Sequence, residues 1–561
     1  MLEKSGAGQR NSKLTGEWTL FADVPGGYGW KPRCSWPDDE FIGEMMKRMF
    51  AFTILMLGAY CVCAQTTPRP SGAVPLQCGG TCVTTAAGAA ANIVNGNPIV
   101  PSGIAPQVAI LPGGAQPSGT LATALATYGA NTTIILPPSY SETVTTEVAM
   151  NAASVTLKCS TGATLTRSSG LTRPIITITA NNVTITGCSI NSNNVGEGSF
   201  GQTVLASGAS NVTFTGNNVF NIEDNGIVGY GSNNFTLDSN TLSSNQYSSS
   251  VSGVGCYFYA QTGTPMTGLR VTNNRFNGSG CDIEDLNTGQ IEGFIFTGNT
   301  GSISNNGEAL LAGGDFSSTK NSPVLNGTIA DNTCFLVGPS SAQEPFSCYT
   351  FAEGYGFNIT GNTNYAAGQW VNDSIFEIGG LMNSTISGNT IYAGSDPGSQ
   401  NYADFIGYLG GNTYANNNIY GTSRNGSAYQ IYANTTKYNG GAVNANNNSF
   451  VGGNIIGTAP FGSLVIAVSI QCPVSGSSVT GTKIQGLNIA GAFLQGINVQ
   501  DDTARSCPAS ATIDNNTFNG AHTGIEVINA TANIGSNTYI GVTTNLSPSG
   551  MVTITNGTLL P

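Results

Sequence analysis

Short apolar segments separated by polar positions recur along the chain from about residue 132 onward. Early examples are Thr132–Leu136, Val155–Leu157 and Val183–Ile185, which lie among Gly, Asn and Ser residues. These segments are short and have no helical period, so they are predicted to be β-strands. An earlier stretch, Gly119–Tyr128, has helical spacing instead. The pattern therefore predicts one short helix followed by a long succession of short strands.

A motif of two apolar residues one position apart, with Asn three residues after the second, repeats through this region. Successive copies lie 21 to 34 residues apart. The second apolar residue of each copy is Ile185, Phe214, Leu237, Val271, Phe296, Ile329, Ile359, Ile386, Ala415, Ala445, Val479, Ile513 and Ile534. The Asn then falls at Asn217, Asn240, Asn274, Asn299, Asn332, Asn362, Asn389, Asn418, Asn448, Asn516 and Asn537, with Cys188 and Thr482 as the departures.

The repeated Asn has a physical use in a solenoid. Asn tolerates the left-handed backbone region and hydrogen-bonds to neighbouring backbone through its side chain. If each repeat is one coil, the Asn side chains lie above one another and bond to the next coil as a ladder. One coil cannot bury its apolar face alone, so stacking creates a continuous core.

The Asn repeat, the short strands and the helix-then-strand beginning (GTLATALATYGANTTIILPPSYSETVT) resemble the pectin-lyase-like superfamily of right-handed parallel β-helices. The resemblance covers about residues 118–561. It implies an all-β fold, a single-stranded right-handed parallel β-helix of about 12 to 13 coils whose N-terminal end is capped by the helix. The superfamily holds lyases, glycoside hydrolases, epimerases, adhesins and spike proteins, so the resemblance implies a fold and leaves the activity open.

The charge balance limits the partners. The chain carries Lys+Arg 18 against Asp+Glu 30, a net charge of -12, and has no basic stripe, which argues against nucleic acid. It also argues against acidic polysaccharides unless a metal bridges the two. Only 9% of residues are charged, yet 40% are hydrophobic and recur regularly, so a large core is expected.

A targeting segment precedes the repeats. Met46–Arg48 is basic, Phe50–Tyr60 is apolar, and Val62–Ala64 is a small-residue cleavage site before Gln65. This is the order of a signal peptide, and the apolar run is too short to span a membrane. We therefore divide the chain into a probable mis-assigned upstream start, the signal peptide, a Pro/Ala/Gly-rich irregular region and the β-helix, at residues 1–45, 46–64, 65–117 and 118–561. Secretion to the outside of the cell or to the periplasm follows, with no transmembrane segment in the mature chain. We expect a monomer, with an oligomer left open.

The cysteines fit an oxidising compartment. The chain has 13 cysteines, and removal of Cys34, Cys61 and Cys63 with the N-terminal segments leaves an even number. Cys256 and Cys281 lie 25 residues apart, as do the nearby anchors Val271 and Phe296, so both are expected at one station of successive coils. The full set of predicted disulfides is Cys256–Cys281, Cys472–Cys507, Cys159–Cys188, Cys334–Cys348 and Cys78–Cys82.

Aligning two coils on Cys256 and Cys281 places Tyr257 and Tyr259 beside Asp282 and Glu284, all pointing outward because side chains alternate along a strand. Glu308 is expected at the station of Asp282 on the next coil, and Gly226 and Val228 on the coil before. Asp282 and Glu308 would then lie about 5 Å apart, and Asp282 and Glu284 about 7 Å apart. These separations bracket the retaining and inverting ranges of glycosidases.

Three interpretations of this patch stay open. Tyrosine rings can stack on sugars while Asp282, Glu284 and Glu308 act as acid and base. The same carboxylates can hold Ca²⁺, which takes several oxygen ligands, although no residue spacing indicates a metal site. A charged outer face can also do no more than keep the solenoid soluble. No cofactor is otherwise predicted.

A second candidate site combines Asp501 and Asp502 with His522, which follows about one coil later in a Gly-Ala-His-Thr-Gly segment. The order and spacing of the Asp pair and the His segment are similar to those of the catalytic residues of polygalacturonase-type hydrolases. Thr523 stands where they have Gly, no Asn-Thr-Asp precedes the pair, and no Arg-Ile-Lys follows. The site is therefore the second choice for catalysis.

Two functional hypotheses result. In the first, the protein binds an extracellular polysaccharide along an outer face and, if it is an enzyme, cleaves it by hydrolysis rather than by a lyase reaction. In the second, it is a non-catalytic adhesin or matrix protein whose solenoid is a rigid spacer. The sequence fixes neither the glycan nor the linkage.

Overall fold

A computed structural model gives the conformation of most of the chain after residue 106. It describes residues 107–194, 202–244, 253–261, 263–285, 289–304, 308–314, 324–337, 347–352, 354–366, 375–393, 403–407, 409–421, 427–433, 444–457, 465–501 and 506–554, together with an antiparallel pair, β1 (Asn92–Val94) and β2 (Asn97–Ile99). The predicted upstream start, signal peptide and Cys78–Cys82 pair lie outside these residues. Within them, no helix is long and apolar enough to cross a membrane.

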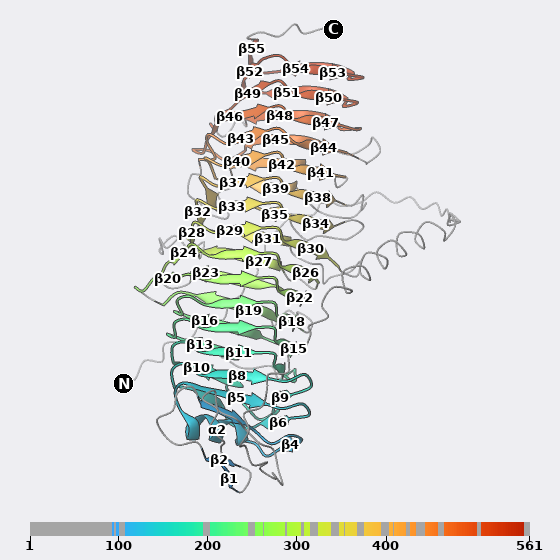
Figure 1. Cartoon of the computed structure of the whole chain (residues 1–561). Helices are drawn as coiled ribbons and strands as arrows, with labels where there is room; N and C mark the ends of the chain where they lie inside the picture. Colours follow the sequence, from blue (N-terminus) through green and yellow to red (C-terminus); the bar gives the residue numbers. More distant parts are fainter. Residues whose placement is uncertain are drawn as a thin grey trace, which may run out of the picture. The chain divides into compact units, whose positions relative to one another are not determined.

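The described strands from β3 onward form parallel sheets that stack coil upon coil (Figure 1). Sheet 1 carries the apolar residue of the repeated motif, and each of its strands pairs in parallel with the strand one coil later. Its strands are β3 (Gln107–Ile110), β5 (Thr132–Leu136), β8 (Thr156–Cys159), β11 (Thr184–Thr186), β14 (Thr213–Thr215), β17 (Thr236–Asp238), β21 (Arg270–Thr272), β25 (Ile295–Thr297), β29 (Thr328–Ala330), β33 (Asn358–Thr360), β37 (Thr385–Ser387), β40 (Thr413–Ala415), β43 (Ser449–Val451), β46 (Val479–Gln485), β49 (Ala509–Asp514), β52 (Thr531–Ile534) and β55 (Met551–Ile554).

Sheet 2 follows sheet 1 in each coil, directly after the ladder residue. Its strands are β4 (Ala115–Gln116), β6 (Ser141–Val144), β9 (Thr164–Arg167), β12 (Ser189–Asn191), β15 (Asn218–Ile222), β18 (Thr241–Ser244), β22 (Arg275–Gly278), β26 (Thr300–Ile303), β30 (Thr333–Leu336), β34 (Thr363–Ala366), β38 (Thr390–Ala393), β41 (Asn418–Tyr420), β44 (Asn454–Ile456), β47 (Asn488–Ala490), β50 (Thr517–Asn519) and β53 (Thr538–Ile540).

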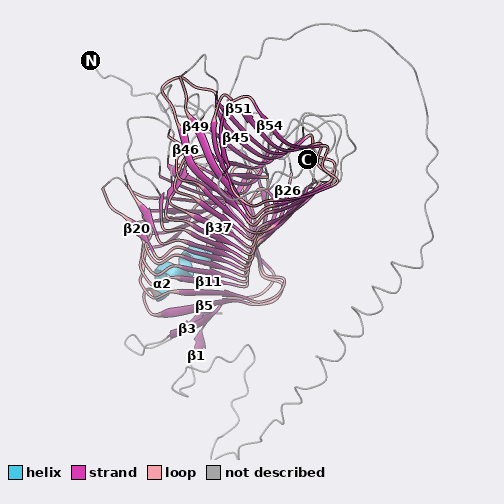
Figure 2. Cartoon of the chain, turned by 90° about the horizontal axis from the view of Figure 1, so that it is seen from above, coloured by secondary structure: helices cyan, strands magenta, loops and turns pink. Residues whose placement is uncertain are grey.

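Sheet 3 completes the coil, and Figure 2 shows these sheets from above, wrapped around a common interior. Its strands are β7 (Val148–Met150), β10 (Ile176–Ile178), β13 (Gln202–Ser207), β16 (Asn225–Tyr230), β19 (Val254–Tyr259), β23 (Cys281–Asp285), β27 (Glu308–Gly314), β31 (Ser347–Phe351), β35 (Phe376–Glu377), β39 (Ala403–Gly407), β42 (Ser427–Tyr432), β45 (Ile466–Cys472), β48 (Gln495–Asp501), β51 (Thr523–Ile528) and β54 (Thr544–Pro548).

The middle coils add a short sheet 4 between sheets 3 and 1. It consists of β20 (Met266–Thr267), β24 (Ile291–Glu292), β28 (Val324–Leu325), β32 (Gly354–Tyr355) and β36 (Leu381–Met382).

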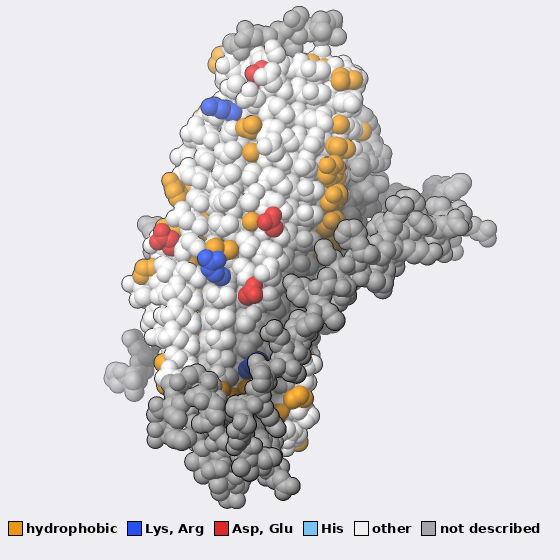
Figure 3. Space-filling view, viewed as in Figure 1, with side chains coloured by type: hydrophobic (Ala, Val, Ile, Leu, Met, Phe, Trp, Pro, Cys, Tyr) orange, Lys and Arg blue, Asp and Glu red, His pale blue; other side chains and the backbone are white. Residues whose placement is uncertain are grey.

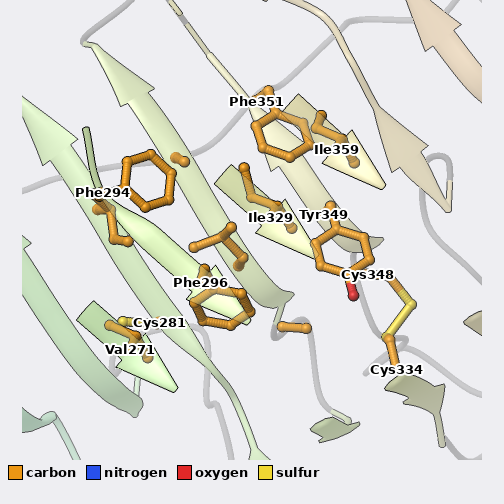
Figure 4. Close-up of a cluster of buried hydrophobic side chains, with 14 of the residues drawn as sticks. Val271, Cys281, Phe294, Phe296, Ile329, Cys334, Cys348, Tyr349, Phe351 and Ile359 are labelled. Carbon is orange, nitrogen blue, oxygen red and sulfur yellow. A yellow bond between two sulfur atoms is a disulfide. The ribbon is translucent and has the colours of Figure 1, made fainter. Parts of the chain in front are cut away.

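Alternate residues of most strands point inward and are buried in one continuous core, whereas the last three strands, β53 to β55, contain no buried residue. The middle of this core is aromatic: Phe294 packs edge-on against Phe357, and Tyr349 stacks on Phe376 with ring centroids 4.7 Å apart. Figure 4 shows how side chains from successive coils, among them Val271, Phe296 and Ile329, line up in the interior. Strand alternation and coil stacking therefore account for the burial of the motif's apolar positions.

The predicted helix is α2 (Thr120–Tyr128), which packs on β3, β5 and β7 and covers the N-terminal end of the stack. The carboxylate of buried Glu142 accepts hydrogen bonds from the backbone N–H of Gly119 (2.8 Å) and of Leu121 (3.1 Å). A carboxylate at this end satisfies exposed N–H groups and complements the helix dipole. The capping prediction is confirmed.

The predicted Asn ladder exists, and each rung has the same form. Asn299 Nδ2 donates to the carbonyl of Val271 (2.9 Å) and to Asn332 Oδ1 (3.1 Å), and the Asn299 backbone N–H donates to that same oxygen (2.8 Å). Bonds of this kind connect Asn217, Asn240, Asn274, Asn299, Asn332, Asn362 and Asn389 without a break. Cys188 lies one coil before the first Asn of the ladder, and its backbone N–H donates to Asn217 Oδ1.

Three of the predicted anchors were wrong, and two of them, Ala415 and Ala445, lie where Asn residues run together. The partner of Ile386 in sheet 1 is Tyr414 rather than Ala415, so the next rung is Asn417 rather than Asn418. The following anchors are Phe450 and Ile484 instead of Ala445 and Val479. Asn448 belongs to a second ladder at the start of sheet 1, where it bonds to the N–H of Asn412 (3.1 Å).

The stack is also longer than the predicted solenoid of about 12 to 13 coils. Strands β3, β5, β8 and β55 pair in sheet 1 although their coils lack the Asn of the motif. The pairing of β3 with β5 places the first strand of the solenoid at Gln107, before the predicted boundary at residue 118. The predicted irregular region therefore ends earlier than expected.

Four of the five predicted disulfides are present: Cys159–Cys188, Cys256–Cys281, Cys334–Cys348 and Cys472–Cys507. Cys256 and Cys281 face each other at one station of β19 and β23, as the coil count required. Cys472 pairs in register with Asp501 instead, and Cys507 lies in the connection before β49. Both cysteines nevertheless lie at the corner between sheets 3 and 1, in two successive coils.

Candidate functional site

The acidic and aromatic patch predicted on sheet 3 starts from the register of β19 and β23. Tyr257 lies opposite Asp282, and Tyr259 lies opposite Glu284. Phe258 and Ile283, between them, are fully buried in the core. Because side chains alternate along a strand, the two tyrosines and the two carboxylates share the outer face. The predicted register of these two strands is confirmed, and the roles of the four residues stay predictions.

A third tyrosine joins the patch from the coil before. β16 pairs with β19 so that Val228 lies opposite Tyr257 and Tyr230 opposite Tyr259, which corrects the expected Gly226 and Val228 by two residues. The rings of Tyr230 and Tyr259 have centroids 4.6 Å apart, and those of Tyr257 and Tyr259 4.9 Å apart. Tyr230 was missed because the length of that coil cannot be counted from its sequence.

The three rings differ in how much surface they offer. Tyr257 is only 8% exposed, so its ring supports Tyr259 rather than presenting a face of its own. Tyr230 and Tyr259 are half-buried and form the outer part of the cluster. The candidate platform for a ligand is therefore Tyr230 with Tyr259, next to Glu284.

Asp282 and Glu284 occur two residues apart on β23 and are both half-buried. Two residues of an extended strand advance the chain by about 7 Å. This is the spacing of the two backbone positions, and it is compatible with the carboxyl separation of about 6.5–9.5 Å in inverting glycosidases.

Glu308 does not lie beside Asp282. β23 and β27 pair so that Asp282 lies opposite Leu311 and Glu284 opposite Gly313, whereas Glu308 lies opposite Ser347 of the next coil. The prediction assumed a coil as short as the one before, but Cys281 and its partner Leu310 are 29 residues apart and Cys256 and Cys281 only 25. The retaining pair of Asp282 and Glu308 is therefore wrong.

The corrected register also bears on the Ca²⁺ alternative. Three carboxylates were expected at one place. The register leaves Asp282 and Glu284 together but puts Glu308 three residues before Leu311, the partner of Asp282 on β27. Among the residues that the structure describes, no group of three or more His, Cys, Asp or Glu side chains is arranged to hold a metal. Any Ca²⁺ dependence stays a prediction.

The second candidate site is not brought together. Asp501 ends β48, whereas exposed His522 precedes Thr523, which lies opposite Gln495 at the start of β48. Six residues of strand separate these two positions, about 20 Å. Asp502 lies outside the described residues. The similarity to the polygalacturonase pattern is therefore one of sequence order only.

The site continues as a row of register positions along sheet 3. From Tyr257 and Asp282 the row passes through Leu311, Thr350, Glu377, Ile406, Gln430, Ser469, Asn498 and Glu526. At its far end the Gln495 side-chain amide donates to the Glu526 carboxylate, and Asn498 Nδ2 donates to Gln495 Oε1 (3.0 Å). The row is therefore not an open polar surface, because Thr350, Glu377, Ser469 and Asn498 are buried and Leu311 is apolar.

Comparison with known proteins agrees on the fold. A family model described as right handed beta helix region matches residues 148–316. No curated protein matches the chain. Together with the parallel stacking, the family model confirms the predicted right-handed parallel β-helix.

Similar solved structures include ORF18 of Geobacillus virus E2, at 12% identity and a TM-score of 0.43, covering 55% of this chain and 59% of that one. The catalytic domain of a GH87 alpha-1,3-glucanase, a D1069A variant with tetrasaccharides, has 12% identity and a TM-score of 0.41, covering 80% and 68%. The A-module of the Azotobacter vinelandii mannuronan C-5 epimerase AlgE6 has 14% identity and a TM-score of 0.36, covering 63% and 91%. Similarity at this level concerns the fold alone. The chain spans 59% of the length of ORF18.

Proposed function

We propose that this protein is secreted and binds an extracellular polysaccharide at the tyrosine–carboxylate patch of sheet 3, where Asp282 and Glu284 hydrolyse it. The observation that carries the proposal is the register that sets Tyr257 and Tyr259 against Asp282 and Glu284 on adjacent strands. Secretion rests on the four disulfides, which persist in oxidising compartments, and on the signal segment expected at residues 46–64.

Binding rests on the aromatic cluster and on its position beside Asp282 and Glu284. Tyrosine combines an apolar ring with a hydroxyl, which suits a sugar, whose ring has apolar C–H groups and polar hydroxyls. The half-buried rings of Tyr230 and Tyr259 are stacked with centroids 4.6 Å apart, and Tyr259 lies opposite Glu284. A sugar can lie against the exposed part of these rings while its hydroxyls reach the half-buried carboxylates of Asp282 and Glu284.

Hydrolysis rests on the two carboxyl groups of β23. An inverting mechanism needs a carboxylic acid that protonates the leaving oxygen and a carboxylate that activates water on the opposite side of the sugar. The spacing of Asp282 and Glu284 leaves room for that water. In the assignment that we propose, Glu284, which lies opposite Tyr259, is the acid, and Asp282 is the base.

The decisive experiment is a screen of the mature protein from Gln65 against neutral and acidic polysaccharides, scoring binding and release of reducing ends separately. Tyr259→Ala should weaken binding, whereas Glu284→Gln should retain binding and stop turnover. Glu292→Gln, at an exposed position of sheet 4, is the matched control. Binding without turnover in the wild type would favour the non-catalytic alternative. A wild type that binds no polysaccharide would reject the proposal.

A further inference from the structure

A second aromatic feature lies on sheet 2, away from the patch just described. Phe335, Tyr365, Tyr392 and Tyr420 occupy one register row on four successive strands, β30, β34, β38 and β41. Their ring centroids are 4.9, 5.0 and 5.4 Å apart, and neighbouring rings are within 7°, 6° and 19° of parallel. We call these four residues the aromatic strip.

The strip is exposed at three of its four residues. Phe335, Tyr365 and Tyr392 are each 37–38% exposed, and Tyr420 is half-buried. Figure 3 shows a line of hydrophobic side chains over the strands that Figure 1 labels β30 to β41. Because the rings stack on one another, they present edges and, in the three tyrosines, hydroxyl groups rather than open ring faces.

A polar row runs beside the strip, two residues earlier on each strand. It consists of Thr333, Thr363, Thr390 and Asn418, all half-buried on the same outer face. It continues beyond the strip as an amide ladder in which Asn454 Nδ2 donates to Asn418 Oδ1 (2.7 Å) and Asn488 Nδ2 donates to Asn454 Oδ1 (3.0 Å). Apolar edges and neutral hydrogen-bonding groups therefore run side by side along the solenoid axis.

The strands of this face carry no charge. From β26 to β50, the described strands of sheet 2 contain no Asp, Glu, Lys or Arg. A partner that is held by ion pairs, such as an acidic polysaccharide or a charged peptide, finds no counter-charge on these strands, and the net charge of -12 repels anions further. The ligand of this face should therefore be neutral.

Stacked aromatics also stabilise neighbouring strands, so the strip needs no ligand to account for its ring contacts. What strand pairing leaves unexplained is the exposure of three rings beside an uncharged polar row. A ligand that uses the whole strip must repeat once per coil, at about 5 Å. An extended sugar chain advances by about one ring over that distance, whereas a peptide strand advances by about 3.3 Å per residue.

We infer that the aromatic strip and its polar row form a second binding face, which holds a neutral, extended polysaccharide along the solenoid axis. The inference rests on the proposed function for the class of ligand and adds a surface that is separate from the sheet 3 patch. Each sugar lies across one coil, with its apolar edge against a ring and its hydroxyls toward Thr363, Thr390 or their equivalents. The face anchors a long chain and performs no chemistry.

The test compares three double variants of the mature protein by retardation in gels that contain neutral or uronic-acid polysaccharides. Tyr365→Ser with Tyr392→Ser removes the middle of the strip. Tyr365→Phe with Tyr392→Phe keeps the rings. Tyr355→Ser with Met382→Ser is the matched control, because these residues are equally exposed at 44% and 42% but lie on sheet 4. Melting curves confirm that each variant is folded.

We expect retardation by a neutral polysaccharide and none by uronic-acid polymers. The Ser pair should lower the affinity about tenfold, the Phe pair less, and the control pair not at all. Equal retardation of the Ser pair and the wild type would overturn the inference. So would concentration-dependent self-association that the Ser pair abolishes in the absence of polysaccharide binding, since the strip would then bind a second copy of the chain. Loss of binding in Tyr259→Ala alone would leave the proposed function standing and reject this second face.

Discussion

Asn332 Oδ1 accepts two hydrogen bonds from Asn299 of the preceding coil, one from the backbone N–H (2.8 Å) and one from the side-chain amide (3.1 Å). Both residues are 2% exposed, so water cannot replace these bonds. Asn332→Ala should leave two buried donors unsatisfied and lower the free energy of unfolding by roughly 1–3 kcal/mol. Chemical denaturation measures this loss, and a variant as stable as the wild type would contradict the ladder.

The neighbouring residues Asn417 and Asn418 provide a matched pair for the corrected register. Asn417 is buried, and its Oδ1 accepts the backbone N–H of Asn389 (2.9 Å), whereas half-buried Asn418 accepts only the side-chain amide of Asn454 (2.7 Å). Asn417→Ala should therefore cost roughly 1–3 kcal/mol. Asn418→Ala should cost no more than about 0.5 kcal/mol, as surface substitutions usually do. The reverse order of stabilities would restore the register that the motif alone suggested.

The fold could be predicted because the ladder Asn and its apolar anchor are required at every coil, whatever the length of the connections. The exact register of the strands could not be predicted, because insertions in the connections change the length of each coil. Glu308 was misplaced for this reason: its coil is longer than the one before, by residues that no local pattern marks. Runs of Asn around residues 415–418 and 444–448 offered several equivalent positions for one rung.

The aromatic strip, by contrast, left a readable signal. Phe335, Tyr365 and Tyr392 each follow their ladder residue, Asn332, Asn362 and Asn389, by three positions. The ladder fixes the start of sheet 2, so an aromatic at that offset in successive coils must stack on the outer face. The cluster with Tyr230 had no such marker, since sheet 3 follows the most variable connections.

The corrected register predicts different roles for two glutamates. Glu284→Gln should stop turnover and retain binding, because the amide keeps the shape and cannot transfer a proton. Glu308→Gln should leave turnover of the same polysaccharide within about twofold, because Glu308 lies opposite Ser347 and not beside Asp282. Reducing-end release measures both. Loss of activity in Glu308→Gln with an unchanged melting temperature would return Glu308 to the site.

The tyrosines predict how stability depends on alkaline pH. Burial raises the pKa of Tyr539 from 10.0 to about 12, and burial also raises the pKa values of Tyr349 and Tyr414. A phenol whose pKa is higher in the folded state contributes stability that is fully present below the pKa of the unfolded state. This stability is lost as the pH rises through the pKa of the folded state. The melting temperature should therefore fall as the pH rises from 10 to 12. Tyr539→Phe should reduce the slope, with Tyr355→Phe as the control, and an unchanged slope would contradict the assignment.

Polysaccharide binding at the tyrosine–carboxylate patch of sheet 3 is measured most directly by a calorimetric titration. Oligosaccharides of the polysaccharide that the screen selects are titrated into the mature wild type and into Tyr259→Ala. Removal of the ring next to Glu284 should weaken binding by about tenfold at an unchanged melting temperature. Equal affinities of the wild type and Tyr259→Ala for the same oligosaccharide would contradict binding at this patch.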